Sequence, residues 1–357
     1  MLAGLLLAAV AATLLLVDVL SADKGPGGEA PEATPTVSGQ VTPTAAGLAA
    51  ASAAALPAGA DPRVWPEELI CPSERSFKAD QIEQLGYAPE VVFFGGSRST
   101  RFEPSYLREQ TGLEGFNLAM TNGKPEDAWV FAHFLHERAL DTRLRWVWGV
   151  QTSTINDRDL EAGLIQDPRL NRYLPAGLLR KQGALLPQTP EEVPESGRVE
   201  RRKYSPDGVI LWNSYDKAEE RGRTLERSLE IYLKRALAKQ RAVTGDGDKR
   251  TRSRKYFEAT LGYLNEIGAE PVIVAMPVHP LVLEALRPGG WQERHERFLA
   301  YLDSLHDHYE FEFIDLSEIE SFDGDPTDFY DGVHIKAANA RRVIDALVHA
   351  FPETFAE

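Results

Sequence analysis

From about residue 90 to the C-terminus, short apolar runs alternate with longer amphipathic stretches. Five runs have the length and the flanking turn residues of buried β-strands: Glu90–Phe94, Gly115–Met120, Arg145–Val150, Glu270–Met276 and Glu310–Leu316. Apolar positions recur with a helical period in Pro125–Ala139, Ala218–Arg241, Arg252–Ile267, Trp291–Leu305 and Ala337–Phe351. This alternation predicts a three-layer α/β sandwich whose central sheet is mainly parallel. Functional side chains are then expected at the C-terminal ends of the strands.

Residues 157–250 interrupt this alternation. They carry few strand signals and many charged residues. We therefore interpret them as a helical insertion between two core strands, within a folded domain that spans residues 67–357.

The first 22 residues are strongly apolar. Leu2–Val17 is almost entirely Leu, Ala and Val, and Val19 and Leu20 extend the run to the length of a membrane-spanning helix. We interpret residues 1–22 as an N-terminal transmembrane anchor or a signal peptide. Leu20 is a poor match to the small residue expected two positions before a cleavage site at Ala22, so an uncleaved anchor is the preferred alternative.

Residues 23–66 consist mainly of Ala, Gly, Pro, Thr and Ser. Such a composition buries too little apolar surface to offset the entropy of ordering, which predicts a disordered linker. An apolar N-terminus followed by a spacer is typical of a domain tethered outside the cytoplasm, in the cell envelope, or secreted if the N-terminus is cleaved.

Composition and charge exclude some classes of protein. The chain has 39 basic and 54 acidic residues, a net charge of −15, which argues against nucleic acid as a partner. Cys71 is the single cysteine, so an intramolecular disulfide and a cysteine-based zinc site are both excluded. We expect Cys71 to be structural.

Two short motifs carry the candidate chemistry. Gly95-Gly96-Ser97 follows the first strand, and taken alone it predicts only a strand-to-helix turn. Asp331-Gly-Val-His334 stands just before the last helix. A serine hydroxyl becomes a useful nucleophile when a histidine accepts its proton and a carboxylate orients that histidine. Ser97, Asp331 and His334 are therefore candidates for one catalytic group.

In these motifs and their order the chain resembles the SGNH hydrolase superfamily, or GDSL-type esterases. That family has G-D-S after its first strand and D-x-x-H in its last block. The resemblance covers residues 89–350 apart from the insertion. It implies a flavodoxin-like fold, with Ser97 as nucleophile, His334 as base and Asp331 as the orienting carboxylate, and it implies no cofactor. Gly96 stands where the family most often has Asp.

The resemblance also implies an oxyanion hole. Gly123 follows the second strand and matches the family's glycine donor, with Asn122 as an alternative if the register slips by one residue. Gln151 follows the third strand, where the family has an asparagine, and it offers the same amide on a longer arm. Asn156 is the rival for that role. Because loss of one donor can cost about 100-fold in rate, weak catalysis or none is an alternative outcome.

Other polar residues near these motifs have simpler interpretations. His279 is expected on the rim that holds the site, in a loop role. Arg98 and Arg101 flank the nucleophile and could hold an anionic substrate group, although solvated arginines are more common. The acidic loop suggests calcium, but Asp328 stands where a calcium-binding loop needs glycine, so we expect no metal. Its aspartates are Asp323, Asp325, Asp328 and Asp331.

Together these features predict a membrane-tethered, extracytoplasmic serine esterase or O-acyltransferase that works through an acyl-enzyme. Its substrate would be an acylated small molecule or polysaccharide, such as acetylated envelope carbohydrate. The alternative is an SGNH-like binding or assembly subunit of a cell-envelope complex with little chemistry. An α/β-hydrolase is disfavoured because Ser99 stands where its G-x-S-x-G motif needs glycine.

Overall fold

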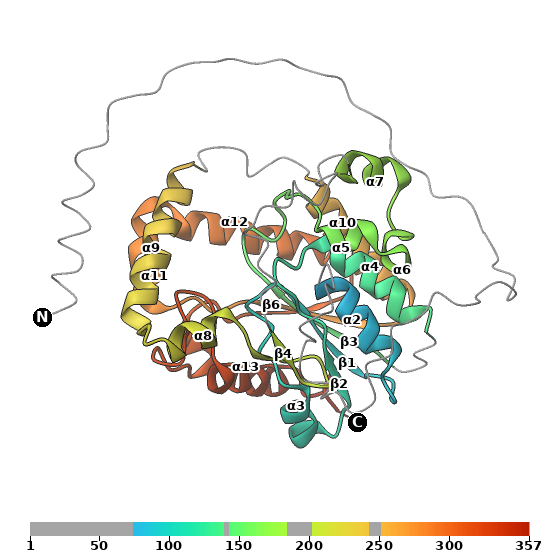
Figure 1. Ribbon diagram of the computed structural model, residues 1–357, viewed down its shortest axis with the longest axis horizontal. Coiled ribbons are helices and arrows are strands. Elements are labelled where there is room, and N and C mark those ends of the chain that lie inside the picture. Colours follow the sequence, from blue (N-terminus) through green and yellow to red (C-terminus); the bar gives the residue numbers. More distant parts are fainter. Residues whose placement is uncertain (1–73, 139–142, 184–201, 243–250, 357) are drawn as a thin grey trace, which may run out of the picture. The chain divides into compact units, whose positions relative to one another are not determined.

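A computed structural model describes residues 74–138, 143–183, 202–242 and 251–356 (Figure 1). The predicted anchor at residues 1–22, the predicted linker at residues 23–66 and Cys71 lie outside the described residues. Within the described part of the chain, no helix is both long and apolar enough to cross a membrane.

The core is a five-stranded parallel sheet with the order β2-β1-β3-β6-β7. Its strands are β1 (Val91–Gly95), β2 (Gly115–Asn117), β3 (Arg145–Val150), β6 (Glu270–Ala275) and β7 (Glu312–Asp315). These are the five strands predicted from the apolar runs, within a few residues at their ends. The order is that of flavodoxin-like sheets, 2-1-3-4-5 when only these strands are counted. The α/β class with a mainly parallel central sheet is thereby confirmed.

Side chains of β1 show how the sheet is covered on both faces. Val92 and Phe94 pack with the helices of one face, whereas Val91 and Phe93 pack with those of the other, because successive side chains of a strand point to opposite sides. The first face is covered by α2 (Glu74–Glu83), α4 (Pro125–His136), α10 (Arg252–Glu266) and α12 (Trp291–Leu305). The second face is covered by α3 (Pro104–Thr111) and α13 (Ala337–Ala350).

The segment between β3 and α10 is mixed rather than purely helical. It contains α5 (Ala162–Gln166), α6 (Pro168–Asn171), α7 (Ala176–Gly183), β4 (Lys203–Tyr204), β5 (Ile210–Trp212), α8 (Ser214–Glu220) and α9 (Leu225–Ala242). Elsewhere, α11 (Pro280–Leu286) and the 3-10 segments η2 (Arg287–Gly289) and η3 (Ile319–Phe322) lie in the loops that follow β6 and β7.

The antiparallel β4–β5 pair was not expected from the sequence. Its residues Tyr204 and Ile210 are buried, and the Ile210 N–H donates to the Thr100 carbonyl at 3.1 Å. The two strands are too short to show a period-two pattern, and tertiary contacts with the core hold them in place.

The single helix predicted over Ala218–Arg241 is wrong, because the structure has two helices, α8 and α9. Gly222 lies between them with a φ of 82°, a left-handed conformation that terminates helices. The Thr224 hydroxyl then accepts a hydrogen bond from the Arg227 N–H at 3.3 Å, which caps the start of α9.

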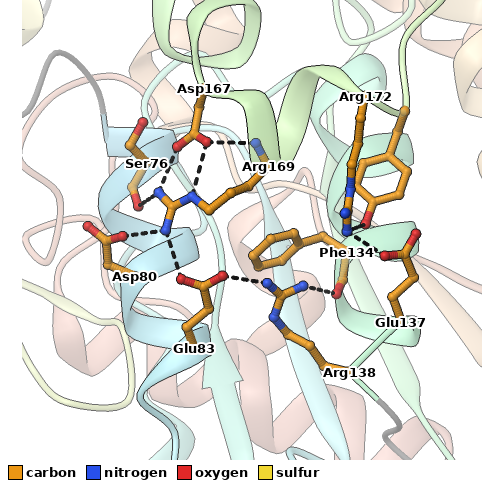
Figure 2. A network of polar contacts seen from close by, with 10 residues as sticks. Ser76, Asp80, Glu83, Phe134, Glu137, Arg138, Asp167, Arg169 and Arg172 are labelled. Atoms are coloured by element: carbon orange, nitrogen blue, oxygen red, sulfur yellow. Dashed lines mark hydrogen bonds and ion pairs between the residues drawn. The ribbon is translucent and has the colours of Figure 1, made fainter. Parts of the chain in front are cut away.

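A network of charged side chains joins α6 to α2 and α4 (Figure 2). The Arg169 guanidinium contacts Asp80 at 2.6 Å, Glu83 at 2.8 Å and Asp167 at 2.7 Å. Arg138, at the end of α4, pairs with Glu83 from the other side. Apart from the buried Asp167, these groups are partly exposed, so each pair contributes little stability alone. Glu83 links the two arginines because it pairs with both.

Lys78 on α2 is fully buried, which is rare for a lysine. Its ammonium donates to the Asn117 carbonyl at 2.7 Å and to the Gly208 carbonyl between β4 and β5. Burial lowers the pKa of Lys78 to about 7, and the nearby Glu74 carboxylate only partly opposes that effect.

We therefore expect Lys78→Met to change how stability depends on pH. Between pH 7 and 9 the unfolded lysine keeps its proton while the folded lysine loses it, so wild-type stability should rise with pH relative to the variant. The expected relative slope is up to about 1.4 kcal/mol per pH unit. Chemical unfolding at several pH values measures it, with exposed Lys234→Met as the matched control. Parallel pH profiles for wild type and Lys78→Met would contradict the assignment.

Candidate active site

The last residue of β1, from which the turn begins, can only be glycine. Gly95 has a φ of 148°, and a Cβ there would lie 2.6 Å from the Ser99 Oγ and 2.8 Å from the Gly149 carbonyl oxygen. The Ser99 N–H donates to the Gly96 carbonyl at 3.0 Å and closes the turn. At Gly96 an added Cβ would have only an ordinary contact at 3.9 Å, so this position has room for a Cβ and does not itself require glycine.

Asp331 and His334 lie at the tip of a short loop closed by an antiparallel bridge between Phe329 and Ile335. The Tyr330 N–H donates to the His334 carbonyl at 2.8 Å, and Phe329, Val333 and Ile335 are buried. These contacts anchor both sides of the loop and leave its tip facing Ser97.

The Asp331 carboxylate organises the tip. Its Oδ1 accepts hydrogen bonds from the Val333 N–H at 2.9 Å and the His334 N–H at 3.0 Å. This local turn brings the imidazole back onto the same carboxylate, which explains physically why the two residues are three positions apart.

Ser97, His334 and Asp331 are in contact in series. The Ser97 Oγ lies 2.9 Å from His334 Nε2, and His334 Nδ1 lies 2.8 and 3.0 Å from the two Asp331 carboxylate oxygens. Because a carboxylate can only accept, Nδ1 carries the hydrogen and Nε2 presents its lone pair to the serine hydroxyl. The arrangement has the geometry of a nucleophile, a base and an orienting acid.

The pKa of Asp331 is lowered. Burial by itself would raise it, but the hydrogen bond and charge of His334, together with the N–H groups of Val333 and His334, outweigh burial. The carboxylate therefore stays ionised at neutral pH, where it can hold the imidazole and stabilise an imidazolium.

The strand register brings Gln151 close to the nucleophile. Gly95 pairs with Gly149 in the parallel β1–β3 ladder, so Ser97 and Gln151 each follow that pair by two residues. The Gln151 backbone bonds with Thr154, at 2.9 Å through its N–H and 2.8 Å through its carbonyl. Its side-chain amide has no hydrogen-bond partner among the described residues, so it is available to a ligand.

Gly123 lies beside the same turn, but its N–H is occupied. An added Cβ would be 2.1 Å from the Gly95 carbonyl oxygen, so close packing by itself requires glycine. The Gly123 N–H donates to the Met120 carbonyl at 3.0 Å. Asn122, with a φ of 54°, has an N–H without an acceptor in the part of the chain that the structure describes. Of the two alternatives, Asn122 offers the available backbone donor.

Tyr215, at the start of α8, is a site residue that the sequence did not indicate. Its hydroxyl lies 3.0 Å from His334 Nε2, and its ring centroid lies 4.4 Å from that of the imidazole. It comes from the segment interpreted as an insertion, in which no motif marks it. Only the tertiary structure brings it to the triad.

Asp216 connects α8 to the turn that carries Ser97 and to the loop that carries Asp331 and His334. Its carboxylate pairs with Arg101, which follows the nucleophile, and accepts from the Tyr330 hydroxyl at 2.6 Å. Glu219 adds a pair with Lys336 at 2.7 Å. Arg101 is therefore paired with α8 rather than solvated.

We call β4, β5 and α8, residues 203–220, the roof segment.

Arg98 differs from Arg101. It is half-buried and forms a hydrogen bond with the Tyr232 hydroxyl on α9. Asp331 and Tyr215 lie near enough to interact electrostatically with its guanidinium. Among the described residues no carboxylate forms an ion pair with it. It is thus the arginine beside Ser97 that remains able to meet an anionic group.

His279, the N-cap residue of α11, supports the loop of residues 329–335 that carries Asp331 and His334, which we call the catalytic loop. The backbone N–H of His279 donates to the Gly332 carbonyl at 2.9 Å, and its ring Nδ1 accepts from the Leu281 N–H at 3.2 Å. In the acidic loop, Asp325 accepts from Thr327, and Asp328 accepts from the Asn339 N–H. The described residues contain no group of acidic, histidine or cysteine side chains arranged to hold a metal ion.

Comparisons with known proteins leave the family open. No family model matches the chain, and no curated protein matches it. One similar solved structure is a Bacteroides fragilis protein provisionally named an acylhydrolase, at 10% identity and a TM-score of 0.37, covering 78% of this chain and 96% of that one. Another, from Streptococcus pneumoniae, is provisionally named a platelet activating factor, at 11% identity and a TM-score of 0.35, covering 79% and 90%. Similarity at this level identifies neither family nor activity, so function is argued from the site.

Asp331→Asn should slow the reaction of Ser97 with a fluorophosphonate probe by at least about 100-fold. The amide would turn an N–H toward Nδ1 and favour the tautomer that cannot accept the serine proton. Labelling rates followed by mass spectrometry measure the effect, and Asp325→Asn is the matched control in the same loop. Labelling of Asp331→Asn at more than a tenth of the wild-type rate would refute the orienting role.

Gly332→Ala should loosen α9 from the catalytic loop. The added Cβ would lie 2.4 Å from the Tyr232 ring and 2.7 Å from Val282. Overpacking of this kind costs about 1–3 kcal/mol, which chemical unfolding would detect, and labelling of Ser97 should slow as well. Gly86→Ala, where the new methyl group meets open space, is the control. Equal stability of the two variants would show that α9 does not press on this loop.

Proposed function

We propose that this chain is an SGNH-type serine esterase or O-acyltransferase that acts through an acyl-enzyme. The observation that carries the proposal is the series of contacts from Ser97 through His334 to Asp331, at the C-terminal edge of a parallel sheet. Support for the SGNH family comes from the order of the two motifs and from the flavodoxin-like strand order.

In the first half of the reaction, the Ser97 oxygen attacks the ester carbonyl carbon while His334 Nε2 accepts the hydroxyl proton. Asp331 stabilises the imidazolium that forms. The imidazolium then donates its proton to the leaving alcohol oxygen as the carbon–oxygen bond breaks. The products of this half are a free alcohol and an acyl group on Ser97.

The negative charge on the carbonyl oxygen needs donors during this step. The Ser97 N–H has no acceptor among the described residues, and the Gln151 amide follows the neighbouring strand. We assign these two groups to the oxyanion hole, with the Asn122 N–H in place of Gly123 as the third donor.

We extend the proposal to location and substrate from the N-terminal sequence. An anchor at residues 1–22 and a linker at residues 23–66 would hold the domain outside the cytoplasm. Acetyl esters on envelope carbohydrate are then the proposed substrates, and the half-buried Arg98 would favour those that carry a nearby anionic group.

A second candidate is an SGNH-like binding or assembly subunit with little chemistry. It is favoured by the Tyr215 hydroxyl, which lies 3.0 Å from the same nitrogen that Ser97 needs. Gly96 and Gln151, which depart from the family pattern, point the same way.

Wild-type protein should hydrolyse 4-nitrophenyl acetate and react with a fluorophosphonate, and Ser97→Ala should abolish both because it removes the hydroxyl whose proton His334 accepts. Exposed Ser105→Ala on α3 is the matched control and should behave as wild type. Hydrolysis that survives in Ser97→Ala would refute the catalytic assignment. Absence of both reactions in wild type and in every variant would favour the binding subunit.

A further inference from the structure

Two hydroxyl groups approach the same nitrogen of His334. The Ser97 Oγ lies 2.9 Å from Nε2 and the Tyr215 hydroxyl lies 3.0 Å from it. With Nδ1 protonated and donating to Asp331, Nε2 has one lone pair in the ring plane. The serine and the tyrosine therefore compete to donate to it.

The phenol is the stronger competitor, because its proton is more acidic than that of an aliphatic hydroxyl. While Tyr215 holds Nε2, the base is less able to accept the Ser97 proton. In the resting site the three residues are thus in contact, but Tyr215, a residue of the roof segment, reduces the ability of His334 to accept the Ser97 proton.

The position of the Tyr215 hydroxyl matters most in the acyl-enzyme. Ser97 then has no hydroxyl hydrogen, and Nε2 must accept a proton from the oxygen that attacks the acyl group. The attacking oxygen must come within hydrogen-bond distance of Nε2, and the Tyr215 oxygen already lies at that distance. A water molecule has to displace it before hydrolysis can occur.

Tyr215 is held firmly in this position. Asn213 and Asp216 cap the start of α8, with the Asn213 oxygen accepting from the Tyr215 N–H at 2.8 Å. Asp216 also pairs with Arg101 and accepts from the Tyr330 hydroxyl. The first turn of α8, which carries Tyr215, is therefore held from the side of the nucleophile and from the side of the catalytic loop, and the Tyr215 ring itself packs against the imidazole of His334.

We propose that Tyr215 is a specificity-determining residue that disfavours water and selects an alcohol, such as a sugar hydroxyl, as the acyl acceptor. Water brings too few contacts of its own to displace the phenol, whereas a larger alcohol that binds against the roof segment replaces one O–H donor on Nε2 by another. This inference rests on the proposed function. Within that function it favours acyl transfer to an alcohol over hydrolysis.

The step balances without a further reactant. The acceptor oxygen attacks the acyl carbon, and its proton passes to Nε2. The bond from the acyl carbon to the Ser97 oxygen then breaks, and the serine oxygen takes the proton from the imidazolium. The acceptor leaves as an ester, and Ser97 and His334 return to their starting states.

Tyr215→Phe tests the proposal because it removes the hydroxyl and keeps the ring. With 4-nitrophenyl acetate as substrate and water as the acceptor, the steady-state rate after the burst of nitrophenol should rise roughly 5- to 10-fold, the factor expected when one competing hydrogen bond is lost. Fluorophosphonate labelling of Ser97 should accelerate as well. With glucose added as a larger alcohol acceptor, the ratio of acetylated glucose to free acetate should fall relative to wild type.

Tyr106→Phe is the matched control, since the Tyr106 hydroxyl bonds to Asp345 on α13 and does not contact His334; it should leave all three readouts unchanged. Unchanged or slower deacylation in Tyr215→Phe, with wild type active, would overturn the role of Tyr215 and leave the proposed function standing. If neither wild type nor Tyr215→Phe reacts with either probe, the proposed function and this inference both fail. A variant that reacts faster than wild type supports both.

Discussion

The candidate site depends on one carboxylate. Asp331 accepts two backbone N–H groups of its own loop and the Nδ1–H of His334, so a single side chain fixes both the loop and the tautomer of the base. Since its pKa is lowered, it remains charged at neutral pH and can serve both purposes. Without that charge, the Ser97 hydroxyl would face an imidazole with no defined acceptor.

The rest of the domain holds this loop against the end of β1. The parallel sheet places the nucleophile turn and Gln151 at adjacent strand ends. Tyr232 of α9 and His279, which precedes α11, pack against the loop from outside. The roof segment joins the two halves through Asp216. Fold and site are thus connected by a small number of polar contacts whose partners are far apart in the sequence.

The features that could be predicted from sequence were those that leave a local pattern. The core strands are apolar runs bounded by turn residues, and D-x-x-H is a compact motif because its geometry is local. Gly222 lies between α8 and α9, but a single glycine within a helical pattern does not by itself predict that the helix is interrupted. The β4–β5 pair, the buried Lys78 and Tyr215 left no readable pattern, because each is positioned by tertiary contacts. The occupied Gly123 N–H also depends on a turn that the sequence does not specify.

The most direct test of the central claim is to trap the acyl-enzyme. Wild-type protein is mixed briefly with 4-nitrophenyl acetate, quenched in acid and digested, and the acetylated peptide is located by mass spectrometry. We expect one acetyl group, on Ser97, that is absent from Ser97→Ala. An acetyl group on another residue, or nitrophenol release with no acetyl group on Ser97 at any time, would contradict it.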